Sequence, residues 1–222
     1  MFRQLSILAR KESLNKAHNS MKIVRIEPII DAGEFSRSDE WKRLRGQITQ
    51  AIKSVQWPPG SGSFTLYDEP GKKRGKGSGV KPIKQACMNK LESLGWQLET
   101  PIDIATVVRP GPMDATIQVR DHLFCVEWET GNVSSSHRAI NKMALGILKK
   151  ILIGGALIVP TRKMYNYLTD RVGNFRELSP YFPLWSALNI HEGLLIVIAI
   201  EHDAVSKDVP RIKKGTDGRA LQ

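Results

Sequence analysis

The sequence is poor in the features that would place it in a disulfide-rich, zinc-structured or membrane class. Its 222 residues include only two cysteines, Cys87 and Cys125, which predicts buried, reduced thiols in a cytoplasmic protein. There is no CxxC motif and the five histidines are scattered, so no zinc site is visible. The longest apolar run, 151–160, is about half of the ~20 residues that a membrane helix needs, so no membrane partner is expected.

Acidic residues are also in deficit. The chain has 22 Asp and Glu against 33 Lys and Arg, giving a formal net charge of +11 and a pI near 9.8. Such a balance is typical of proteins that bind a polyanion such as nucleic acid. The alternative is a basic soluble protein without such a partner. The hydrophobic fraction of 41%, with five Trp, is too high for a disordered chain and predicts a folded core.

The chain is predicted to form one domain with a polar segment at each end. Residues 1–20 are basic and poor in acids, and a second methionine, Met21, opens the first apolar strand. The first twenty residues are therefore an extension, a start codon placed too early, or a transit peptide. The folded domain is expected to span 21–204, and 205–222 is expected to be a basic C-terminal tail.

Hydrophobic periodicity predicts strands and helices in mixed order. The segments 151–159 and 193–200 are apolar without alternation, which indicates strands buried on both faces. The second half reads β-β-α-β-α-β, with one helix running from Thr161 toward Leu178. This order favours the α/β class, with a central mixed β-sheet flanked by helices on both faces. Further strands are predicted at 21–30, 63–69, 115–119 and 123–129, and further helices at 38–55, 83–94 and after Ser136.

A glycine-rich basic segment lies in the first half of the chain. Between 70 and 91 there are seven Lys and Arg and no acid. The glycine spacing in 71–79 is too short for a phosphate-binding loop, and no Ser or Thr follows the lysine. We expect a flexible arm that contacts a nucleic-acid backbone, the alternative being a solvated charged loop. Its candidate DNA-binding residues are Lys72, Lys73, Arg74 and Lys76.

Three acids are predicted to converge across two strands. Because successive strand residues face opposite ways, Cys125, Glu127 and Glu129 share one face of an otherwise apolar segment. Asp114 reaches the same place if the two strands pair antiparallel. Buried carboxylates are costly unless they are paired or bind a cation, and several together favour a hard cation such as Mg²⁺. The alternative is that both glutamates lie on a solvated sheet face.

These residues resemble the PD-(D/E)xK nuclease superfamily, and within it the BamHI/BglII-like type II restriction endonucleases. The pattern reads Pro112-Met113-Asp114 on one strand and Glu127-Trp128-Glu129 on the next, with Glu129 in place of the usual lysine. The surrounding VEWETGN is the part most similar to the BamHI/BglII-like enzymes. The resemblance is best over 114–159, and the order of elements is compatible as far as residue 200.

The resemblance implies metal-dependent cleavage of a DNA phosphodiester. Asp114 and Glu127 would bind Mg²⁺, with the backbone carbonyl of Trp128 as a third contact. Glu129 would bind a second Mg²⁺ or accept a proton from the attacking water. Some relatives add an acid from an upstream helix; Glu92 is the nearest candidate here, unless it is simply solvated.

Polar residues after Glu129 are candidates for reading DNA. The resemblance places this region at the major groove, where Asn and Arg contact base edges and a helix start binds phosphate. The alternative for the serines is helix capping, and His137 is also a weak candidate for a general base. The residues concerned are Asn132, Ser134, Ser135, Ser136, His137 and Arg138.

The sequence therefore predicts a homodimeric, Mg²⁺-dependent endonuclease that cuts double-stranded DNA at a palindromic site. The dimer surface is expected on the helix 139–150 and its neighbours, by analogy with the family. Two alternatives stay open. One is a DNA-binding protein without catalysis, and the other is a repair or RNA-directed nuclease of the same superfamily.

Overall fold

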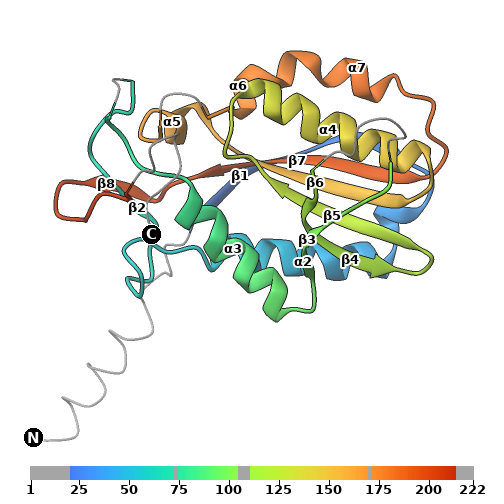
Figure 1. The fold of residues 1–222 in the computed structure, drawn as a ribbon, viewed down its shortest axis with the longest axis horizontal. Coiled ribbons are helices and arrows are strands. Elements are labelled where there is room, and N and C mark those ends of the chain that lie inside the picture. Colours follow the sequence, from blue (N-terminus) through green and yellow to red (C-terminus); the bar gives the residue numbers. More distant parts are fainter. Residues whose placement is uncertain (1–20, 73–74, 105–110, 170–171, 214–222) are drawn as a thin grey trace, which may run out of the picture.

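The computed structural model describes residues 21–72, 75–104, 111–169 and 172–213. The predicted extension 1–20, together with Lys73 and Arg74, lies outside the described residues. None of the described helices is long and apolar enough to cross a membrane. The described chain is built around a six-stranded sheet with helices on both of its faces, which confirms the predicted fold class (Figure 1).

The sheet is mixed, and its strand order is β1-β7-β6-β5-β4-β3. The three central strands run parallel, whereas β1, β4 and β3 pair antiparallel with their neighbours. The two apolar segments form the middle strands β6 and β7, buried nearly throughout as predicted. The strands are β1 Lys22–Ala32, β3 Gln97–Thr100, β4 Met113–Val119, β5 His122–Trp128, β6 Leu152–Pro160 and β7 Gly193–Glu201.

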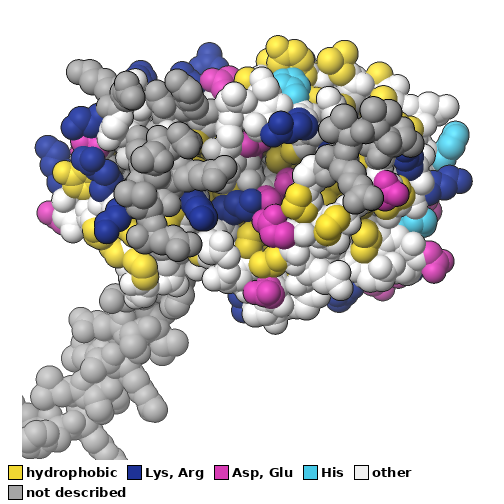
Figure 2. All heavy atoms as spheres, viewed as in Figure 1, with side chains coloured by type: hydrophobic (Ala, Val, Ile, Leu, Met, Phe, Trp, Pro, Cys, Tyr) yellow, Lys and Arg dark blue, Asp and Glu magenta, His cyan; other side chains and the backbone are white. Residues whose placement is uncertain are grey.

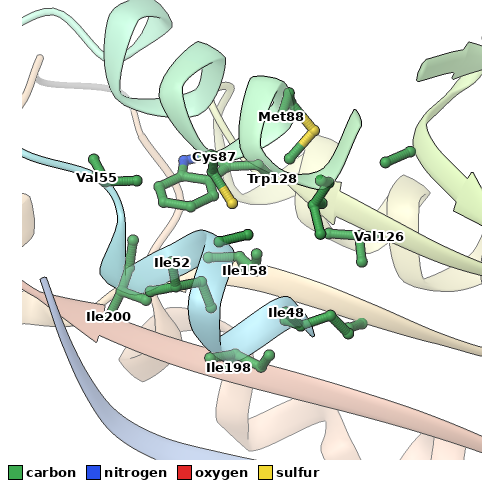
Figure 3. Close-up of a cluster of buried hydrophobic side chains, with 14 of the residues drawn as sticks. Ile48, Ile52, Val55, Cys87, Met88, Val126, Trp128, Ile158, Ile198 and Ile200 are labelled. Carbon is green, nitrogen blue, oxygen red and sulfur yellow. The ribbon is translucent and has the colours of Figure 1, made fainter. Parts of the chain in front are cut away.

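Helices α2 (Asp39–Lys53) and α3 (Lys81–Ser93) cover one face of the sheet. The other face carries α4 (Val133–Leu148), α6 (Phe175–Leu178) and α7 (Phe182–Ser186). Helix α2 begins where the Ser38 hydroxyl accepts the Trp41 N–H at 3.1 Å. Its buried stripe packs against α3 and the sheet in the core of Figure 3, which includes Ile48, Ile52, Cys87, Met88, Val126 and Ile198.

Strand β5 alternates as predicted. Phe124, Val126 and Trp128 lie in the core under α2 and α3, and Cys125 lies in the core under α4. Burial raises the pKa of the Cys125 thiol well above its usual range, so it stays neutral and structural. The same alternation puts Glu127 on the α4 side of the sheet.

The predicted helix from Thr161 to Leu178 is wrong. The structure has two short helices there, α5 (Arg162–Tyr165) and α6, capped by the side chains of Thr161 and Asn174. Between them the backbone of 166–169 hydrogen bonds to another part of the chain instead of continuing a helix. Its partners are the backbone groups of Gly71 and Ser78.

These bonds also correct the prediction of a flexible basic arm, at least for its described part. The N–H of Gly71 donates to Asn166 at 2.7 Å, and that of Ser78 donates to Tyr167 at 2.7 Å. A Cβ atom at Gly71 would lie 1.6 Å from the Leu168 carbonyl oxygen, so only glycine allows this approach. The segment is therefore anchored at both ends to 166–169.

The predicted tail is likewise ordered as far as the structure describes it. Strand β8 (Ala204–Ser206) pairs in parallel with β2 (Thr65–Tyr67) in a separate two-stranded sheet. Ile212 is buried, and the Pro210 carbonyl accepts the Trp57 indole N–H at 2.7 Å. Residues 205–213 thus pack on the domain instead of trailing from it.

His202, between β7 and β8, predicts a pH dependence of stability. Burial lowers its pKa to about 4, and its ring packs edge-on against Tyr167. The unfolded chain therefore takes up a proton near pH 6.5, before the folded one does. The contribution of His202 to the free energy of unfolding is therefore fully present above about pH 6.5. It is lost as the pH falls toward 4, by an expected ~1–2 kcal/mol.

The measurement is urea unfolding of wild type and His202→Gln at pH 7 and pH 4.5. Carboxylates also titrate in this range, so the quantity of interest is the difference between the two proteins. The variant should lose less stability than wild type on acidification. Equal losses would show that His202 is protonated as easily in the fold as in the unfolded chain.

Candidate active site

A cavity of about 600 Å³ opens where β5 ends, between α3 and α4. In the view of Figure 2, acidic side chains lie near the centre of the molecule, and Lys and Arg gather on the side that carries β2 and β8. The cavity is lined by the predicted catalytic segment and by both flanking helices. Its charged lining residues are Lys84, Asp114, Glu127, Glu129, Arg138 and Lys142.

Asp114 and Glu127 lie side by side. The antiparallel β4–β5 ladder ends at the pair of Ala115 and Val126, and Asp114 and Glu127 are the next residues of the two strands beyond it. Asp114 Oδ2 accepts the Trp128 N–H at 2.7 Å. Both acids are largely buried, with 7% and 8% of their surface exposed. The predicted convergence of these two acids is therefore present.

Two lysines, one from each face of the sheet, neutralise this pair. Lys84 of α3 lies 2.5 Å from Asp114 Oδ1, and Lys142 of α4 forms an ion pair with Glu127 Oε1. Sequence reasoning assigned neither lysine to the site. For Lys84 the signal was weak: it stands one turn before the buried Cys87 and Met88, on the flank of the helix's apolar face.

The electrostatics of the pair favour an added positive charge. Burial, and after it the neighbouring Asp114, raise the pKa of Glu127 to about 7 against the opposing effect of Lys142. At neutral pH Glu127 is therefore fully ionised only if more positive charge arrives. Hard carboxylate oxygens are the donors that Mg²⁺ prefers, so the residues present fit that cation.

Glu129 lies in the same cavity, but its carboxylate is engaged elsewhere. Its Oε1 accepts the Gly131 N–H at 2.5 Å. Burial raises its pKa, while the hydrogen bond from the Gly131 N–H opposes that rise. Among the described residues, no group of three or more His, Cys, Asp or Glu side chains could hold a metal ion. The predicted meeting of three acids at one point is thus realised only for Asp114 and Glu127.

Two further predicted ligands can be located. The Trp128 indole is buried in the core of Figure 3, so only its backbone can face the cavity that it lines. Glu92 is exposed near the end of α3 and does not line the cavity. Helix α3 is a rigid rod with about 1.5 Å of rise per residue, so Glu92 lies two turns beyond Lys84, the α3 residue that reaches the site.

The predicted DNA-reading residues divide into three groups. Asn132 caps α4 by accepting the Ser135 N–H at 3.2 Å, so the cap is an asparagine and not a serine. Ser134 and Arg138 are exposed, and Arg138 lines the cavity. His137 packs its ring against Tyr181 and Trp185, at 4.5 and 5.4 Å between centroids, and does not line the cavity. This placement does not suit a general base.

In the glycine-spaced stretch 71–79 of the basic segment, the described lysines are Lys72 and Lys76, which are exposed and do not line the cavity. Lys76 pairs with Glu69 at 3.1 Å, and Glu69 also binds Arg211 at 2.7 Å. Part of the positive charge of Lys76 is therefore compensated within the protein, whereas Lys72 presents its charge on the surface.

Comparison with known proteins gives one consistent family. Residues 21–219 match the family model described as restriction endonuclease BamHI. The chain is 51% identical over 202 residues to the type II restriction enzyme OkrAI of Oceanobacter kriegii, covering 91% of this chain and all of that protein. It is 34% identical over 179 residues to the type II restriction enzyme BamHI of Bacillus amyloliquefaciens, covering 78% of this chain and 80% of that one.

The fold has a solved counterpart as well. The structure of restriction endonuclease BglII complexed with a DNA 16-mer superposes with a TM-score of 0.53. The match covers 85% of this chain and 88% of the other, at 11% sequence identity. At so low an identity the likeness concerns the fold alone.

Proposed function

This chain belongs to the BamHI family of restriction endonucleases and is a site-specific deoxyribonuclease, and we propose that it cuts both strands of a palindromic site as a Mg²⁺-dependent homodimer. Type II restriction endonucleases generally use divalent metal ions. The observation that carries the proposal is the buried pair of Asp114 and Glu127 in an open cavity beside an exposed arginine. A structural ion-pair network would not need such a cavity.

In this proposal Asp114, Glu127 and the backbone carbonyl of Trp128 hold the cation. When bound, the cation would stabilise the negative charge that develops on the phosphate oxygens during hydrolysis. Glu129 would accept a proton from the attacking water at its carboxylate, which burial makes more basic than usual. Alternatively, Glu129 would bind a second Mg²⁺.

The test is cleavage of supercoiled plasmids with Mg²⁺ and with a chelator. Discrete linear fragments that require Mg²⁺ support the proposal, and sequencing their ends gives the recognition site and the cut position. DNA binding without cleavage would favour a non-catalytic DNA-binding protein. A smear of products, or preference for damaged DNA or RNA, would favour another nuclease of the superfamily.

Helix α4 and its neighbours also support the homodimer. Four large apolar side chains on this side of the sheet are exposed, and Figure 2 shows apolar side chains along the edge that carries α6 and α7. Apolar surface of this kind commonly marks an interface. The four are Leu145 at 38%, Leu148 at 46%, Tyr181 at 45% and Leu184 at 67% exposed.

Leu184→Glu is expected to separate the dimer without unfolding the monomer. In a two-fold interface the substitution acts twice, and burying one leucine contributes ~1.5–3 kcal/mol. The dimer Kd should therefore rise by more than about a hundredfold. Sedimentation at several concentrations measures it, with Val24→Glu on β1, at a residue 55% exposed, as the matched control. A Leu184→Glu protein as dimeric as the control would remove this surface from consideration.

A further inference from the structure

Lys142 is a charged residue of the catalytic cavity to which the chemistry above gives no task. It projects from α4, and its side chain is 11% exposed. A lysine so deeply placed is uncommon unless its charge is paired and hydrogen bonded. Its position and partners therefore call for a role.

The Lys142 ammonium has three polar neighbours. It forms the ion pair with Glu127, and it donates to the carbonyl oxygens of Gly111 at 3.1 Å and Pro112 at 3.0 Å. Two of the three N–H donors of the ammonium are thus used by backbone carbonyls, and its charge is compensated by Glu127. An ammonium that is used up in this way is not free to bind a phosphate, which argues for positioning and against direct catalysis.

The partners of Lys142 belong to both segments that carry the proposed metal ligands. Glu127 lies on β5, while Gly111 and Pro112 immediately precede β4, whose second residue is Asp114. Asp114 is fixed separately, by the Trp128 N–H and by Lys84 from the opposite face. For Glu127 the direct partner is Lys142. One ammonium thus sets the position of Glu127 relative to the start of β4.

We propose that Lys142 is a positioning residue that competes with the divalent cation for Glu127; this rests on the proposed metal site. Without the cation, the ammonium neutralises Glu127 and keeps it beside Asp114 despite the repulsion between the two carboxylates. When the cation binds, Glu127 becomes its ligand, and Lys142 remains on the carbonyls of Gly111 and Pro112. The two positive charges are alternative partners of one carboxylate.

The test compares thermal unfolding and cation affinity of wild type, Lys142→Met, Lys142→Arg and Lys149→Met. Mg²⁺ and Ca²⁺ are each titrated into the full-length protein, with EDTA as the metal-free reference and calorimetry for the affinity. In EDTA, Lys142→Met should have a lower melting temperature than wild type. Adding the cation should raise its melting temperature by more than it raises that of wild type, and Lys142→Met should bind the cation about tenfold more tightly. Lys142→Arg keeps the charge and should bind the cation like wild type. Lys149→Met, an exposed lysine at the end of the same helix, should match wild type in both measurements.

A purely structural lysine would give a different result. The melting temperature of Lys142→Met would then lie below that of wild type by the same amount with and without the cation. Its affinity for the cation would be unchanged or weaker. Either finding would overturn the proposal. If Lys142→Met does not fold in EDTA, recovery of the fold on adding cation supports the proposal and failure to recover overturns it. A wild type that shows no cation response and cleaves in EDTA would instead refute the metal site itself.

Discussion

Replacing Asp114 by Asn, or Glu127 by Gln, is expected to reduce DNA cleavage by at least about 10³-fold, while DNA binding survives. A catalytic cation contributes several kcal/mol of transition-state stabilisation, and ~4 kcal/mol corresponds to a thousandfold in rate. Both substitutions keep the shape of the side chain, and in Asp114→Asn the amide oxygen can still accept the Trp128 N–H. The loss should therefore appear in the chemical step and not in folding.

The measurement is single-turnover cleavage of the cognate site, with affinity and melting temperature followed in parallel. Glu129→Gln should also lose most activity, because it removes the proton acceptor or second ligand near the cavity. Glu92→Gln is the matched control, since its carboxylate is exposed and outside the cavity. Near-wild-type cleavage by the Asp114 or Glu127 variant would refute their assignment as ligands.

The second large effect concerns sequence discrimination. Arg138 is exposed, lines the cavity that holds Asp114 and Glu127, and lies in the second turn of α4. We propose that it enters a DNA groove from there. Replacing it by Ala should cost ~1–3 kcal/mol on the cognate site and much less on random DNA. Asn132→Ala is harder to interpret because it also removes the cap of α4, so Asn132→Asp, which keeps an acceptor there, is the better companion.

Lys72→Ala and Lys76→Ala provide the contrast to Arg138→Ala. Lysines outside the cavity suit contact with phosphates, so these variants should bind all sequences more weakly. The slope of the logarithm of the binding constant against the logarithm of the salt concentration should become less steep by about 0.9 for each phosphate that the protein no longer neutralises. Lys72 should have the larger effect, because Lys76 is already paired with Glu69. Loss of discrimination in the lysine variants, with only general weakening in Arg138→Ala, would reverse the two roles.

The parts of the site that could be predicted are those that follow from the two-residue repeat of a β-strand, in which successive side chains face opposite sides of the sheet. Alternation along β5 placed Glu127 with Cys125 and away from Val126, and the antiparallel pairing of β4 with β5 brought Asp114 close to Glu127. The basic composition and the pattern around these acids then indicated the nuclease family. None of this required knowing how the helices pack.

The parts that were missed depend on contacts between distant segments. Lys84 and Lys142 reach the acids from helices on opposite faces, and a long side chain's target depends on how each helix docks. The break after α5 has the same origin, because the backbone of 166–169 finds partners in the segment around Gly71. The helix propensity of a segment depends on its own residues, so it cannot predict a competition for hydrogen bonds with a distant segment.

The pairing of β1 with β7 has a consequence for how the chain folds as it is synthesised. Lys22 stands in register with Glu201, so the first described strand pairs with the last strand of the main sheet. At ~5–20 residues per second, a ribosome needs on the order of ten seconds to make the intervening chain. During that time Ile29 and Ile30, which are buried in the finished protein, lack their native neighbours. Completion of the sheet is therefore a late, non-local event, typical of slow folding, and early chains of this nuclease are exposed to aggregation and to chaperones.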